Sequence, residues 1–146
     1  MTISGRWLHG DTLTGEVLRL DEPLSFWGGL DPATGVIIDQ AHPQAGQSIA
    51  GRVVAMAGSR GSSGTPGVLG EALRIGVGPA ALIVTKADVN LVAGTIVAES
   101  LYGIRCPVLL VDDDVFDGLH TGTELDVPEL DVPEPEATEP DVPEPM

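Results

Sequence analysis

Three short apolar segments that alternate with helix-like segments constrain the fold of this chain most. Residues 51–57, 80–85 and 107–111 are mainly apolar and are built from Val, Ile, Leu, Met and Ala. Residues 66–76 and 89–102 lie between them and carry apolar side chains at helical spacing. Continuous apolar strands between helices are typical of a sheet that is covered on at least one face. The second half of the chain therefore predicts an α/β arrangement.

The first half has strand and turn patterns instead. Residues 15–20 alternate as a strand does, and residues 36–39 form a short apolar run. Residues 21–35 contain two prolines and three glycines, which predict an ordered loop with turns. Residues 123–127 are a candidate last strand. Because this β-rich part must pack on the α/β body, we expect two β layers and one helical layer.

The charge of the chain is unevenly distributed. The 146 residues fit one domain and carry a formal net charge of −15, but nine of the 22 acidic residues lie beyond residue 123. The first 123 residues hold 13 acids and 7 bases, which is ordinary for a soluble domain. Residues 128–146 are rich in acids and prolines and continue a thrice-repeated Asp-Val-Pro. We therefore expect a domain over 1–127 and a disordered tail over 128–146, either a tolerated extension or a docking arm.

Composition also narrows the classes of partner. One lysine and six scattered arginines do not form the basic patch that nucleic-acid binding requires. The apolar runs are far shorter than the roughly 20 residues of a membrane span, and the N-terminal residues lack an apolar signal core. We therefore expect no nucleic acid, no membrane and a cytoplasmic location.

The cysteine and histidine counts limit metal chemistry. Cys106 is the single cysteine, so this chain alone cannot hold an iron–sulfur cluster, which usually needs several thiolates. The three histidines, His9, His42 and His120, lack the close spacing of zinc motifs. We expect no metal site in this chain, and any metal requires ligands from another chain.

The loop Gly58–Gly64 (GSRGSSG) carries the most chemical information. It follows a predicted buried strand and precedes a predicted helix, whose N-terminus favours an anion. Glycines let the backbone approach a ligand closely, and Arg60 is able to clamp a carboxylate or phosphate. Ser62 and Ser63 place hydroxyls at the same point. The loop is neither a nucleotide-binding P-loop nor a hydrolase triad. The residues alone leave open an anion site or a simple glycine–serine surface turn.

Four segments resemble the swivel subunit of the aconitase X family, in the same order and over about residues 5–127. They are DEPLSFWGGLDPATGVIID (21–39), HPQAGQSIAGRVV (42–54), GSRGSS (58–63) and GTIVAESLYGIRCPVLLVD (94–112). The resemblance implies an α/β fold of the swivelling β/β/α type, like the C-terminal swivel domain of aconitase. The family includes archaeal phosphomevalonate dehydratases and bacterial cis-3-hydroxy-L-proline dehydratases.

The resemblance also assigns roles to the loop. It implies that Ser62 is the catalytic base, and from the loop residues themselves we expect Arg60, Gly61 and Ser63 to bind the substrate. A larger partner subunit would carry an iron or iron–sulfur centre and most of the substrate ligands. This chain departs from many relatives at Thr65-Pro66, where they have Gly-Ser. Since proline lacks a backbone donor, this departure affects the contacts to the anion more than the base.

The expected function is that of the small subunit of a two-subunit hydro-lyase, active only with the large subunit. The Arg-rich, Lys-poor composition suggests a GC-rich bacterium, which favours cis-3-hydroxy-L-proline as substrate over phosphomevalonate. A stand-alone small-anion binding module and a structural partner without chemistry are the alternatives from other classes.

Three residues near these motifs have two interpretations each. Trp27 either walls the mouth of the site or is packed for structure. His42 either contacts substrate or stabilises a turn before Pro43. Asp31 either supports the site from behind the residues that contact the substrate or caps a turn. Cys106 has a single interpretation: it precedes a predicted buried strand and is expected to be a small core residue.

Overall fold

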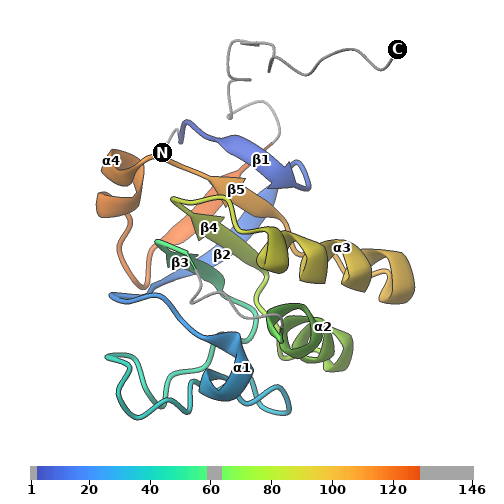
Figure 1. The fold of residues 1–146 in the computed structure, drawn as a ribbon. Helices are drawn as coiled ribbons and strands as arrows, with labels where there is room; N and C mark the ends of the chain where they lie inside the picture. Colours follow the sequence, from blue (N-terminus) through green and yellow to red (C-terminus); the bar gives the residue numbers. More distant parts are fainter. Residues whose placement is uncertain (1–2, 59–63, 129–146) are drawn as a thin grey trace, which may run out of the picture.

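Four parallel strands form the centre of one mixed sheet in the computed structural model, which describes residues 3–58 and 64–128 (Figure 1). They are β2 (Leu13–Arg19), β3 (Val53–Met56), β4 (Ala81–Val84) and β5 (Val108–Leu110). β1 (Arg6–His9) and β6 (Glu124–Val127) are antiparallel edge strands in the order β1-β5-β4-β3-β2-β6. Every residue of β3 and β4 is buried, because side chains on both faces of the sheet are covered. The predicted α/β class is confirmed.

β2 joins the β-rich first half of the chain to the parallel strands of the second half. Its residues 13–16 pair with β6, whereas residues 17–19 pair with β3. The β-rich first half is therefore continuous with the parallel strands. The strand predicted at 36–39 is wrong: Val36 and Ile37 form only isolated bridges, to Ser48 and Leu30. Tight turns on both sides of this run prevent a longer pairing.

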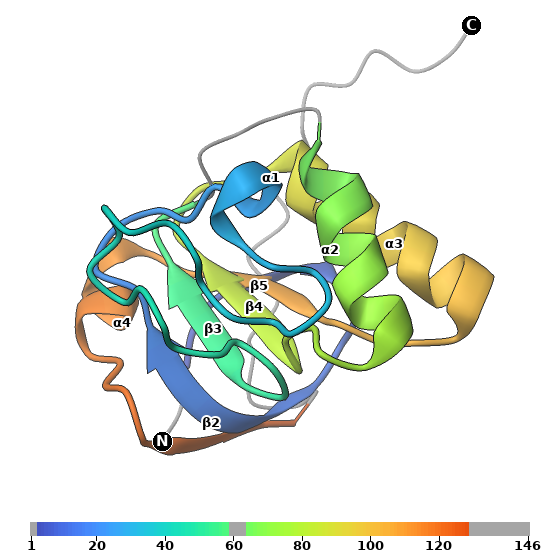
Figure 2. The ribbon, with the colours of Figure 1, turned by 90° about the horizontal axis from the view of Figure 1, so that it is seen from below.

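Two helices cover one face of the sheet (Figures 1 and 2). They are α2 (Thr65–Ile75) and α3 (Val89–Tyr102), which were both predicted. The side chain of Asp88 caps α3 by accepting from the amides of Asn90 and Leu91, at 3.0 and 3.3 Å. No helix in residues 3–58 and 64–128 is long and apolar enough to cross a membrane.

Small residues set the contact between these helices. Leu91, Gly94, Thr95 and Ala98 form the buried face of α3. A Cβ atom on Gly94 would lie 3.2 Å from the Cα of Pro66, so glycine permits the close approach of α2. The larger residues whose spacing indicated this helix, including Ile96 and Val97, are exposed instead. Helical periodicity located the helix but did not identify its buried face.

The segment from residue 21 to 52 covers the same face of the sheet beside α2 (Figure 2). It contains one short helical turn, α1 (Phe26–Gly29), and is otherwise an ordered loop, which the sequence predicted for residues 21–35. His42 is buried and fixes this loop: its Nε2–H donates to the Glu22 carbonyl at 2.9 Å, and its Nδ1 accepts from the Gln44 amide at 3.0 Å. These contacts give His42 a structural role.

A second apolar cluster lies on the opposite face of the sheet. Val115 and Phe116 of α4 (Asp113–Asp117) pack against it. The sequence analysis predicted neither this short helix nor β1. The guanidinium of Arg19 holds α4 in place, because it donates to the carbonyls of Asp117 and Leu119 at 3.0 and 3.2 Å. It also stacks on the Phe116 ring at 4.7 Å.

Replacing Gly35 with alanine should destabilise the chain more than the same change at Gly46. Both glycines have left-handed backbone angles, φ +75° and +90°, which cost about 1–2 kcal/mol for alanine. A Cβ on Gly35 would also lie 2.4 Å from the Val77 carbonyl oxygen, whereas nothing lies within 4 Å at Gly46. We expect Gly35→Ala to lower the free energy of unfolding in urea by about 1–3 kcal/mol more than Gly46→Ala. Equal losses would contradict this packing.

Candidate active site

The glycine-rich loop connects the end of β3 to the start of α2. Its two ends, Gly58 and Gly64, are described, whereas the predicted site residues Arg60, Gly61, Ser62 and Ser63 lie outside the described residues. The roles of these four residues therefore stay predictions. The described ends show which groups surround the loop.

The first end of the loop lies beside the segment that follows β4. The hydroxyl of Thr85 donates to the Ala57 carbonyl at 3.0 Å. A Cβ on Gly58 would lie 3.9 Å from the Cβ of Lys86. The two segments meet because β3 and β4 are parallel neighbours and end at the same edge of the sheet, which is where α/β folds bind ligands.

Lys86 is a candidate site residue that the sequence analysis did not identify. It is the single lysine of the chain, and it is exposed at the first end of the loop. Its position directly after a buried strand could have indicated Lys86 as a site residue, since ligands bind at the carboxyl ends of adjacent parallel strands. Lys86 adds a positive charge beside a loop that already contains Arg60 in the sequence.

The second end of the loop lies against Trp27. A Cβ on Gly64 would be 2.4 Å from the Cδ1 atom and 3.1 Å from the Cβ of Trp27, so only glycine fits here without a shift. Trp27 is 66% exposed, whereas the neighbouring Phe26 is fully buried in the core. Trp27 therefore borders the loop, and Phe26 anchors the segment that presents it.

The N-terminus of α2 lies at the second end of the loop. Gly64 is its N-cap and has no capping side-chain hydrogen bond, and Pro66 contributes no amide donor in the first turn. The hydroxyl of Thr65 is fully buried and has no hydrogen-bond partner within the described structure. The N-terminus of this 11-residue helix favours negative charge at this end of the loop.

Other residues considered from the sequence have structural contacts. Asp31 accepts from the Ala33 amide at 2.9 Å within a turn, and His42 stabilises the same segment. Cys106 is completely buried in the core, as expected. Within residues 3–58 and 64–128 no three His, Cys, Asp or Glu side chains gather as metal ligands. The described side chains do not fit an iron–sulfur cluster, so no chemical step is assigned to one in this chain.

Cys106 should be unreactive in the folded chain. Burial disfavours its thiolate and raises the pKa of the thiol from 9.0 to about 12. At pH 8 we expect a disulfide reagent to label the native chain about 100-fold or more slowly than the denatured chain. The neutral thiol should stabilise the fold below pH 9, and this contribution should be lost as the pH rises from 9 toward 12. Equal labelling rates for the native and denatured chains would contradict the burial, and Cys106→Ala is the blank.

Comparison with known proteins identifies the family of this chain. Residues 2–131 match the family described as the aconitase X swivel domain. The chain is 41% identical over 103 residues to cis-3-hydroxy-L-proline dehydratase of Pseudomonas aeruginosa, covering 70% of this chain and 18% of that protein. It is 43% identical over 113 residues to the phosphomevalonate dehydratase small subunit of Methanothermobacter thermautotrophicus, covering 71% of this chain and 86% of that protein.

Comparison with solved structures also matches aconitase X. The crystal structure of Thermococcus kodakaraensis aconitase X in its holo-form superposes with a TM-score of 0.78 and 30% identity, over 90% of this chain and 94% of that chain. The chain spans less than a fifth of the length of the Pseudomonas aeruginosa and Hypocrea jecorina dehydratases. Sequence and fold agree over nearly the whole described domain, and this chain therefore belongs to the aconitase X swivel-domain family.

Proposed function

We propose that this chain is the small subunit of a two-subunit aconitase X-type dehydratase. The supporting observation is the family match over residues 2–131, in a chain that corresponds to 86% of a phosphomevalonate dehydratase small subunit. In the Pseudomonas aeruginosa dehydratase the matching segment is only 18% of the protein. The rest of the active site then comes from a separate large subunit, and this chain is active only in that complex.

The loop and its surroundings supply the base half of the site. Ser62 removes the proton next to the substrate carboxylate, while Arg60, Gly61 and Ser63 bind the anionic group. A serine hydroxyl is a weak base, so it needs electrostatic stabilisation of its deprotonated form. The N-terminus of α2 and the cation of Lys86, both at described positions beside the loop, would provide this stabilisation.

The reaction is an elimination of water. The C–H bond breaks at Ser62, the C–OH bond breaks on the adjacent carbon, and a C=C bond forms to give an alkene or enamine. In the family resemblance the large subunit holds an iron or iron–sulfur centre, which supplies Lewis-acid assistance to the leaving hydroxyl when bound. This chain's own residues bind the anion and accept the proton.

For the substrate we propose cis-3-hydroxy-L-proline. Pro66 leaves the first turn of α2 with one amide donor fewer, and a carboxylate needs fewer donors than a phosphate group. The second candidate is phosphomevalonate, which is favoured by the correspondence to a separate small subunit in Methanothermobacter thermautotrophicus.

Ser62→Ala should lower kcat of the reconstituted complex by about 10²–10⁴-fold, because general-base catalysis is worth that much. Water loss is followed by NMR with both candidate substrates, and assembly with the large subunit is checked by size-exclusion chromatography. Ser63→Ala is the matched control and should change kcat much less. Dehydration at the wild-type rate by an assembled Ser62→Ala complex would show that Ser62 is not the base.

Lys86→Ala should raise KM for the anionic substrate by about tenfold, which corresponds to about 1.4 kcal/mol of binding. Lys86→Arg should restore most of the affinity, because it keeps the charge. The matched control is Arg52→Ala, which removes a cation near the amino end of β3, where Arg52 lies 4.0 Å from Glu16. An unchanged KM in Lys86→Ala would remove Lys86 from the site.

A further inference from the structure

Helix α3 is apolar on all sides, but the chain covers only one of them. Its 14 residues include a single charged residue, Glu99. The Glu99 carboxylate is engaged by Arg105 Nε at 3.2 Å and by His9 Nε2 at 3.4 Å. The neighbouring α2 instead carries an exposed Glu71–Arg74 ion pair. A helix without a polar face is normally enclosed on all sides.

Four exposed side chains form what we call the α3 face. Val89 is 81% exposed, Leu101 68%, Val97 46% and Ile96 45%. Val89 and Ile96 lie opposite the small residues that contact α2, and Val97 and Leu101 lie on the adjoining side of the helix. At 1.5 Å per residue, the face is about 18 Å long from Val89 to Leu101. Single exposed apolar residues are normal on a protein surface, whereas a contiguous apolar face of this length is typical of an interaction site.

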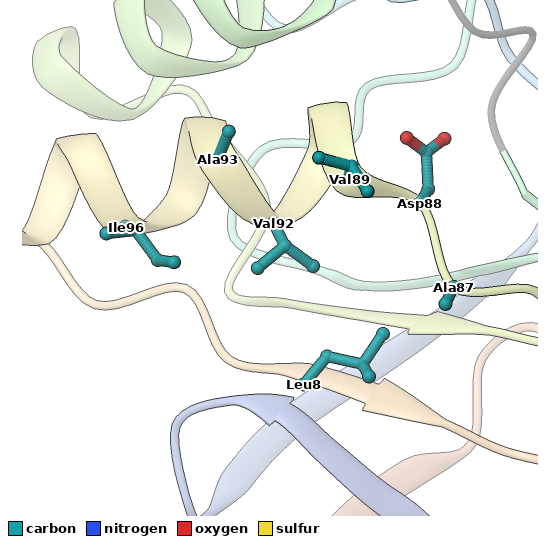
Figure 3. A pocket seen from close by; sticks show the side chains of 7 residues that line it. All are labelled: Leu8, Ala87, Asp88, Val89, Val92, Ala93 and Ile96. Carbon is teal, nitrogen blue, oxygen red and sulfur yellow. The ribbon is translucent and has the colours of Figure 1, made fainter. Parts of the chain in front are cut away.

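An apolar groove continues the α3 face down to the edge of the sheet. Val92 and Ile96 point from α3 toward Leu8 of β1, as Figure 3 shows. The groove has a volume of about 310 Å³ and is also lined by Ala87, Val89, Ala93 and Asp88. Among the described residues that line it, Asp88 is the only charged one, and its carboxylate caps α3.

The groove begins next to the candidate active site. Ala87 directly follows Lys86, whose Cβ lies 3.9 Å from the position of a Cβ on Gly58. A protein that completes the active site over the loop therefore reaches the first end of the groove. A second copy of this chain bound to the α3 face would compete with that protein for access to the groove.

We propose that the α3 face and this groove dock an uncharged, apolar surface of the large dehydratase subunit. This inference rests on the proposed function. In the Pseudomonas aeruginosa and Hypocrea jecorina dehydratases the matching segment is 18% and 19% of the protein, so most of each chain lies outside it. A separate small subunit must hold a partner of that kind through non-covalent contacts, for which an uncharged apolar helix face is suited.

The test measures binding of the full-length chain to the large aconitase X subunit from the same organism, by analytical ultracentrifugation and calorimetry. Val89→Glu and Ile96→Glu should each raise Kd at least about tenfold, because a carboxylate in an apolar contact must be desolvated. Ile75→Glu is the matched control: it makes the same change at a side chain that is 40% exposed on α2, and it should alter Kd less than about twofold.

Thermal unfolding checks that the variants fold. Val89 is the first residue of α3, where a glutamate is favourable for the helix dipole, so Val89→Glu decides the test if Ile96→Glu unfolds. Wild-type Kd in Val89→Glu would overturn the proposal, as would a wild-type chain that does not bind the large subunit. A wild-type homodimer that Val89→Glu dissociates would assign the face to a second copy instead. A complex that depends on the α3 face but dehydrates neither substrate would refute the proposed function and leave the docking surface intact.

Discussion

The parallel pairing of β3 with β4 determines where the chemistry of this chain lies. Their register, from Val53 opposite Ala81 to Met56 opposite Val84, ends both strands at one edge of the sheet. The glycine loop leaves from one strand and Lys86 from the other, and the Thr85–Ala57 hydrogen bond joins the two exits. Because both strands are fully buried, this edge is held by the core and not by the loop itself.

The close contact between α2 and α3 has a second consequence. Gly94 lets the first turn of α2 approach, and that turn begins where the glycine loop ends. Placing small residues on the inner face of α3 leaves its larger apolar side chains on the outer face. One packing requirement thus fixes the helix terminus at the candidate site and also leaves the apolar surface that we assign to the large subunit.

The candidate site was only partly visible in the sequence. The loop Gly58–Gly64 stood out because its glycines, arginine and serines lie between a buried strand and a helix. Lys86 did not, because a single lysine has no motif of its own and becomes relevant only when β4 is placed beside β3. The position of Trp27 beside Gly64 was not visible in the sequence either, because the two residues lie in segments far apart in the chain. His42 is explained by two hydrogen bonds within its own segment.

The sequence by itself determined the α/β class, both long helices and the positions of the four central strands along the chain, since these follow from local apolar periodicity and from glycine and proline positions. It also indicated the family, through segments spread along the domain. Only the tertiary structure decided that β1 closes one edge, that residues 36–39 form bridges and no strand, and which side of α3 is buried. Those features depend on contacts between residues far apart in the chain. For α3 the deciding factor is the distance of closest approach between two helices, which selects small side chains over more apolar ones.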